Sequence, residues 1–109
     1  MFGAASIANA SAPGFRQPIE DAVTRYCFGD VWQRPGLDRK MRSLLTIAML
    51  AVLAKPTQLR AHVKGAIANG ASVEEIRETL MQVMIYGGVP AATDGFAQAE
   101  EVLRDMELI

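Results

Sequence analysis

The sequence is poor in the residues that define several common classes of protein. Its 109 residues include one cysteine, Cys27, and one histidine, His62. A single cysteine excludes a disulfide within the chain and fits a reducing compartment. Because these two residues lie far apart and offer none of the usual ligand spacings, we expect no metal site. No glycine-rich phosphate loop and no Ser/His/Asp arrangement is evident, which argues against nucleotide-dependent enzymes and serine hydrolases.

The sequence also lacks a basic excess and a long apolar run. Its formal net charge is -1, so it has no surplus of cations to neutralise the phosphates of a nucleic acid. The apolar run over 44–54, broken only by Thr46, is shorter than the roughly 20 residues that a membrane-spanning helix needs. We therefore predict neither nucleic acid nor a membrane as partner. The N-terminus lacks the basic start and apolar core of a secretory signal, so we predict a cytoplasmic protein.

Apolar residues make up 50% of the chain, and the run over 44–54 is their densest stretch. A helix without a polar face is usually covered on all sides. We expect this central helix to begin after Asp38, a good N-cap, and to run to Lys55, where Pro56 ends it. A domain of this size buries only about two-thirds of its unfolded surface. So much apolar surface therefore favours a homo-oligomer.

The other proline, glycine and capping residues predict helices on both sides of the central one. The first helix is expected from Pro18 to Phe28, with a stop at Gly29 and a loop over 29–38. Further helices are expected from Pro56 to the turn at 69–70, over 73–86 behind the capping box at 72–75, and from residue 90 onward. No stretch alternates with the period of a strand. The fold class is therefore all-α, a compact bundle of about five to six helices. Residues 1–15 are predicted to be an arm and residues 16–109 the helical domain.

The single histidine is the first candidate for chemistry. His62 lies between Leu59 and Val63, at the edge of an apolar stripe, where half-burial can tune its proton affinity. The same position also suits a packed, hydrogen-bonded histidine with no catalytic part. Trp32 and Tyr86 are polar-edged aromatics that could line a pocket, or could equally belong to the core.

Three arginines form the second candidate. Arg34, Arg39 and Arg42 lie within nine residues around the start of the central helix. Guanidinium groups bind carboxylates through paired hydrogen bonds. The start of a helix prefers anions, so arginines placed there do not stabilise the helix dipole, and this mismatch favours an anion-binding role. The alternative is a solvated basic cap paired with Asp30 and Asp38.

The order of segments resembles the carboxymuconolactone decarboxylase family. The resemblance covers about residues 20–103 and rests on W-x-R-P-G-L-D, R-S-L-L-T-I-A-M-L, A-H-V, N-G with E-E-I-x-E, and Y-x-G-x-P-A-A, in that order. It implies an alkylhydroperoxidase D-like helical fold, assembled as a homo-oligomer, a hexamer or a trimer. It also implies a lyase that removes CO2 from 4-carboxymuconolactone, a small anionic lactone of protocatechuate breakdown, with no cofactor.

The resemblance further implies roles for particular residues. His62 would donate a proton or a hydrogen bond to the developing negative charge, and Arg42 and Arg34 would bind carboxylates. Trp32 and Tyr86 would shape the pocket, and Glu20 on the first helix would orient His62.

Two other functions remain open beside the decarboxylase. The broader family includes redox proteins that need C-x-x-C shortly before the histidine, but Lys55 and Gln58 stand at the two cysteine positions here, and Ser43 stands at the position of their upstream glutamate. This departure disfavours peroxidase chemistry. The other alternative is a non-catalytic oligomer that binds a small acid.

Overall fold

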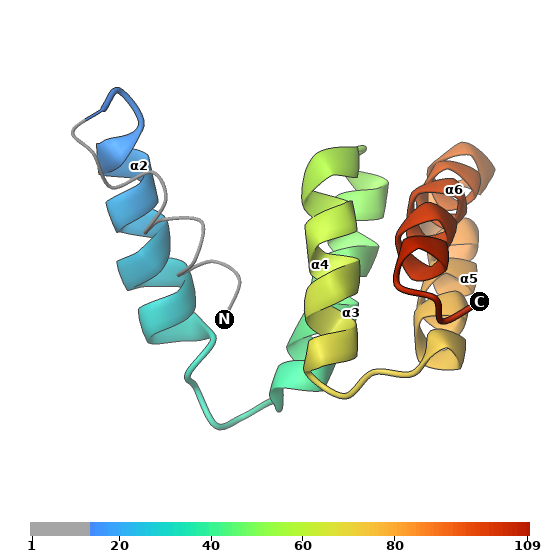
Figure 1. The fold of residues 1–109 in the computed structure, drawn as a ribbon, viewed down its shortest axis with the longest axis horizontal. Coiled ribbons are helices and arrows are strands. Elements are labelled where there is room, and N and C mark those ends of the chain that lie inside the picture. The colour runs from blue at the N-terminus through green and yellow to red at the C-terminus, as the bar shows by residue number, and fades with distance from the viewer. Residues whose placement is uncertain (1–13) are drawn as a thin grey trace. The chain divides into compact units, whose positions relative to one another are not determined.

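The computed structural model describes residues 14–109, which divide into two units, residues 14–37 (unit 1) and residues 38–109 (unit 2). Every regular element among the described residues is a helix, which confirms the predicted all-α class (Figure 1). Most of the predicted arm over 1–15 lies outside the described residues. The elements are α2 (Gln17–Ala22), η1 (Val23–Val31), α3 (Arg39–Val52), α4 (Pro56–Ala68), α5 (Val73–Gly87) and α6 (Val89–Asp105).

Unit 1 is one continuous helical rod in which α2 passes directly into the π-helix η1. The predicted stop at Gly29 is wrong, because the helix continues to Val31 and the connecting loop is correspondingly shorter. A Cβ atom on Gly29 would come within 3.1 Å of the Thr24 carbonyl oxygen, five residues earlier. Glycine here therefore accommodates the wider turn of a π-helix instead of ending the helix.

The first helix of unit 2, α3, begins as predicted and ends earlier than predicted. Asp38 is its N-cap, and its carboxylate accepts a hydrogen bond from the Met41 backbone N–H at 2.8 Å. The helix ends at Val52 and not at Lys55. The chain reverses through Ala54, which has a φ of 57° and so cannot continue a right-handed helix.

The predicted signals at the other helix ends are confirmed. Gly70 adopts a φ of 96° after the C-cap of α4. Ser72 and Glu75 form the predicted reciprocal capping box at the start of α5. Gly88, with a φ of 101°, separates α5 from α6, which begins at Val89, one residue before the predicted start. These turns fix the lengths of the helices in unit 2.

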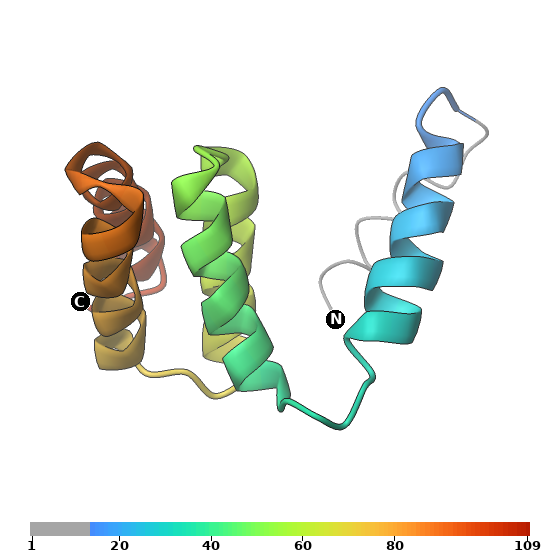
Figure 2. The ribbon, with the colours of Figure 1, turned by 180° about the vertical axis from the view of Figure 1, so that it is seen from behind.

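The four helices of unit 2 enclose one apolar core. Helix α3 packs against α4 and α5, and α6 packs against the same two helices from the other side (Figures 1 and 2). Figure 1 shows the starts of α3 and α5 and the end of α4 at one end of this unit. The most deeply buried large side chains come from all four helices, and they are Ile47, Leu59, Val63, Ile76, Leu80 and Val102.

The expectation that the central helix is covered on all sides is wrong for the single chain. Ile47 and Ala51 of α3 are buried, whereas Leu45, Met49 and Val52 are 43%, 57% and 51% exposed. The physical reason is that the main packing partners of α3 in unit 2 are two helices, α4 and α5, which leave part of its surface uncovered. Across residues 14–109, no helix combines the length and the apolar character needed to cross a membrane.

Candidate functional site

His62 lies on α4, at the boundary between the core and the surface. Its neighbours on the helix, Leu59 and Val63, are buried, while His62 itself is half-buried, as predicted. Its Nδ1 atom is shielded from solvent. This burial lowers the pKa of the imidazole below its ordinary value, because removing water penalises the charged form. The neutral imidazole is therefore favoured at neutral pH.

Arg42 lies in the first turns of α3 and is also half-buried. Its backbone N–H donates to the Asp38 carbonyl at 3.1 Å, and its own carbonyl accepts from the Thr46 hydroxyl at 2.7 Å, so its backbone is fixed on both sides. Since α3 and α4 are consecutive helices that pack together, the structure places Arg42 and His62 on neighbouring helices. Arg39, one turn earlier, is exposed.

A partly buried polar contact joins the start of α3 to the end of α4. The Asn69 side-chain N–H donates to the Ser43 hydroxyl oxygen at 3.0 Å, and Ser43 is only 1% exposed. The local pattern of the sequence indicates only a turn at Asn69 and a serine in place of a glutamate at Ser43. The signal was available, because a serine on the apolar face of a helix needs a hydrogen-bonding partner once buried.

A second contact joins the start of α3 to the start of α5. The Lys40 ammonium lies 3.1 Å from the Glu75 carboxylate, whose other oxygen accepts from the Ser72 backbone N–H at 2.9 Å. The hydrogen bond from the Ser72 backbone, and then that from Lys40, lowers the pKa of Glu75. The first turn of α3 is thus held from two directions, next to Arg42.

Tyr86 lies on a different face of unit 2. It is 87% exposed at the end of α5, where it lines an apolar groove of about 650 Å³ between α3 and α5. Met41, Leu45 and Met49 line this groove on the α3 side. Neither Arg42 nor His62 is among the lining residues. Of these three residues, only Tyr86 lines this groove.

The other three predicted site residues belong to unit 1. Glu20 is half-buried on α2, and its backbone carbonyl accepts from the Thr24 hydroxyl at 3.0 Å. Trp32 caps η1, and its ring packs at a tilt against Phe28 with 5.8 Å between the ring centroids. Arg34 is exposed in the loop that follows. Their part in a site stays a prediction.

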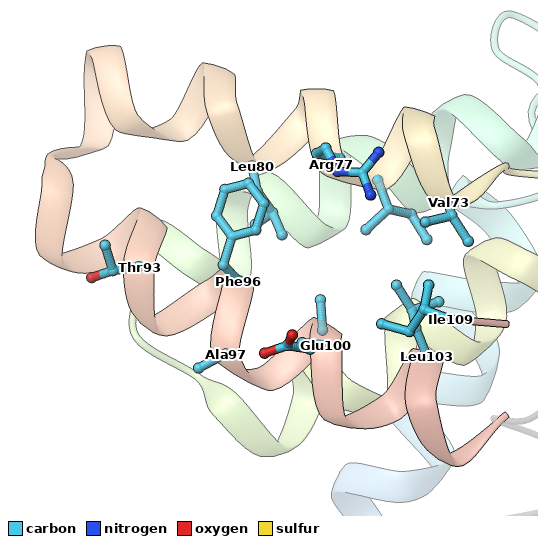
Figure 3. Close-up of a pocket in the computed structure, with 11 residues that line it drawn as sticks. Val73, Arg77, Leu80, Thr93, Phe96, Ala97, Glu100, Leu103 and Ile109 are labelled. Atoms are coloured by element: carbon cyan, nitrogen blue, oxygen red, sulfur yellow. The ribbon is translucent and has the colours of Figure 1, made fainter. Parts of the chain in front are cut away.

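A further cavity, of about 460 Å³, lies between α5 and α6 (Figure 3). Leu80, Phe96 and Leu103 line it, with Arg77 and Glu100 also among its lining residues. Both charged groups have partners on their own helices, since Arg77 pairs with its neighbour Glu74 and Glu100 pairs with Arg104. The lining of this cavity includes none of the predicted site residues.

The chain is similar to known proteins over most of its length. Residues 17–101 match the model of the carboxymuconolactone decarboxylase family. A 4-carboxymuconolactone decarboxylase of Acinetobacter baylyi is 38% identical over 92 residues, which cover 84% of this chain and 69% of that protein. A nitrosuccinic acid decarboxylase of Metarhizium robertsii is 36% identical over 108 residues, covering 97% of this chain and 76% of that protein. An uncharacterized protein of Paracoccus denitrificans is 45% identical over 78 residues, 69% of this chain and 58% of its own length.

The structure defines a class of small all-helical proteins. In this class, a half-buried histidine and a half-buried arginine lie on adjacent helices. The chain belongs to the carboxymuconolactone decarboxylase family, as the order of its sequence motifs indicated.

Proposed function

We propose that the protein is a cofactor-free decarboxylase that acts on a small carboxylated lactone, 4-carboxymuconolactone, in the protocatechuate branch of aromatic catabolism. Family membership and two relatives named as decarboxylases support this proposal. The observation that carries it is the placement of His62 and Arg42, both half-buried, on the packed helices α3 and α4. Such a pair offers one group for an anion and one for a proton or hydrogen bond.

The substrate itself provides the electron sink for this reaction. As the carboxylate leaves as CO2, the electron pair of the broken C–C bond moves through the ring double bond to the lactone carbonyl oxygen. The resulting dienolate then takes one proton on carbon, which completes the product. The protein must hold the substrate's acid groups, stabilise the negative oxygen and allow that proton to arrive.

The two cationic side chains assigned to substrate binding are Arg42 and Arg34. A guanidinium group holds a carboxylate through two parallel hydrogen bonds, which fixes orientation as well as charge. Arg42 suits this work best because its backbone is fixed and its side chain is half-buried, where water competes less. Trp32 and Tyr86 would shape the pocket, and Glu20 would orient His62.

His62 acts as the hydrogen-bond donor to the dienolate oxygen. Its lowered pKa favours the neutral imidazole near pH 7, which keeps one N–H for donation. In this role the neutral ring provides the N–H, so the rate should stay level as the pH rises through the pKa of His62. If the imidazolium were the proton donor, the rate would instead fall as the pH rises through that pKa.

Self-association, as a trimer or hexamer, completes the proposal. Among the described residues, apolar side chains form most of the lining of the α3/α5 groove and no charged residue lines it; Leu45, Met49 and Val52 of this lining are about half exposed. Apolar surface of this kind on a small domain is typical of an interface. Sedimentation of Met49→Glu should show a smaller species than the wild type, while Arg104→Glu, which alters an exposed position on α6, should leave the assembly intact.

The deciding experiment is incubation of the purified protein with 4-carboxymuconolactone while released CO2 is measured, with nitrosuccinic acid as a second substrate. Release of CO2 from the lactone by the wild type, together with no release by His62→Ala, would support the proposal. Tight binding without release from either acid would favour the non-catalytic binding protein. Consumption of peroxide linked to loss of the Cys27 thiol would favour the redox alternative and contradict the decarboxylase.

A further inference from the structure

We propose that Asn69 is a positioning residue of the site: its side chain holds the first turns of α3, and with them Arg42, against the end of the helix that carries His62. The inference rests on the proposed function, since it assigns Asn69 the task of setting the geometry of the Arg42 and His62 pair. Asn69 itself has no assigned contact with substrate.

The contact is built into the fold at both ends. Asn69 is the C-cap of α4, and its backbone N–H donates to the carbonyls of Gly65 and Ala66 at 2.9 and 3.1 Å, so the side chain starts from a fixed backbone. Its amide N–H then reaches Ser43, 26 residues earlier in the chain, at 3.0 Å. Ser43 is 1% exposed and directly follows Arg42.

The burial of Ser43 explains why this hydrogen bond can fix the position of α3 against α4. Two helices packed through apolar side chains can slide or rotate slightly at little cost, because dispersion contacts are not directional. A hydrogen bond is directional, and breaking this one leaves the Ser43 hydroxyl, which is 1% exposed, without compensation from water. The Asn69–Ser43 bond therefore selects one rotation of α3 against α4, and that rotation sets where the Arg42 side chain leaves the helix.

The second contact of the same helix turn provides an internal comparison. Lys40 lies two residues before Arg42 and pairs with Glu75 at 3.1 Å, but the two side chains are 37% and 41% exposed. Exposed ion pairs are weak and are screened by salt. We therefore expect the hydrogen bond to the buried Ser43, and not the more exposed ion pair, to govern the position of Arg42.

The expected consequence appears in substrate binding. A misplacement of about 1 Å in a substrate-holding group can cost about a hundredfold in rate or affinity. Asn69→Ala should raise KM for 4-carboxymuconolactone by at least about tenfold and change kcat much less, because Arg42 holds the carboxylate before and during the reaction. Lys40→Ala, the matched control, should leave KM within about twofold of the wild type.

The test combines this kinetic comparison with a readout that needs no turnover. In a ¹⁵N-labelled protein, the Nε–Hε signal of Arg42 and the ring signals of His62, the one histidine in the sequence, report the site directly. Asn69→Ala should shift both sets of signals and Lys40→Ala neither. Ser43→Ala should reproduce the Asn69→Ala effects, and the double variant should add nothing further, since both changes remove the same bond.

The outcomes separate this inference from the proposed function. If the wild type releases no CO2 but the signals shift as described, the decarboxylase proposal fails and the positioning role stands. If KM and the Arg42 signal of Asn69→Ala match the wild type, the positioning role is overturned whatever the activity. Should Asn69→Ala fail to fold, Ser43→Ala decides in the same way, and unchanged signals there would overturn the inference.

Discussion

The two sides of helix α3 differ more than its sequence suggests. On one side, Ile47 is fully buried and Ser43 is bonded to Asn69 of α4. On the other, Met49 and Leu45 border an open groove beside α5, although they are as apolar as the residues of the buried side. This difference shows that the packing of neighbouring helices, and not the composition of α3, determines which side of α3 belongs to the core. We assign chemistry to the end of α3 that meets α4, and association to the groove.

The largest expected difference between the two sides is in stability. Ile47→Ala should lower the free energy of unfolding by about 2–5 kcal/mol, since it leaves a cavity among residues that are fully buried. Met49→Ala removes a side chain that is 57% exposed and should cost less than about 1 kcal/mol in the dissociated chain. Urea unfolding at low protein concentration measures both values. Equal losses would contradict the assignment of the two sides.

Two glycines that lie against α3, Gly95 of α6 and Gly87 of α5, provide a second comparison, in which the expected difference in stability is smaller. A Cβ on Gly95 would lie 2.9 Å from Leu80 Cδ2 and 3.4 Å from the Ala51 Cβ, both in the core, so Gly95→Ala should cost about 1–3 kcal/mol. A Cβ on Gly87 would lie 2.7 Å from Cγ2 of Val52, which is half exposed and can shift, and 3.2 Å from Cγ1 of the buried Val83. Thermal unfolding should therefore show a larger loss for Gly95→Ala than for Gly87→Ala. The reverse order would place the rigid packing on the groove side.

The smallest expected effect is the pH dependence that His62 contributes. Burial lowers its pKa in the folded state, so between the folded and unfolded pKa values the unfolded chain binds more protons. Its contribution to stability is therefore complete above the unfolded pKa of about 6.5 and declines as the pH falls toward the folded pKa. Unfolding of His62→Gln, followed between pH 8 and pH 5, should lack this decline. A wild type whose stability rises on acidification through this window, relative to the variant, would contradict the lowered pKa.

Local sequence signals predicted the parts of the fold that depend on local chemistry. Asp38, Gly70 and the Ser72–Glu75 box are confirmed because each satisfies backbone groups within a few residues of itself. The early end of α3 was not predictable, since its left-handed turn residue is an alanine, Ala54, and not a glycine. The π-helix was missed because Gly29 is a helix breaker by residue type, whatever the width of the turn.

The candidate site was predictable in its residue types and less so in its arrangement. The half-burial of His62 followed from its place at the edge of an apolar stripe. The contact of Asn69 with Ser43 joins residues 26 apart and depends on how α3 packs on α4, which no local pattern specifies. The exposure of Tyr86 likewise depends on which helices cover the end of α5.

The most direct test of the account is the initial rate of CO2 release from 4-carboxymuconolactone by His62→Ala and Met49→Ala, measured side by side with the wild type. The account predicts a loss of at least about a hundredfold for His62→Ala, the usual size of a lost proton-transfer or hydrogen-bonding group. It predicts a rate within a few-fold of the wild type for Met49→Ala. Full activity in His62→Ala, or equal losses in both variants, would contradict it.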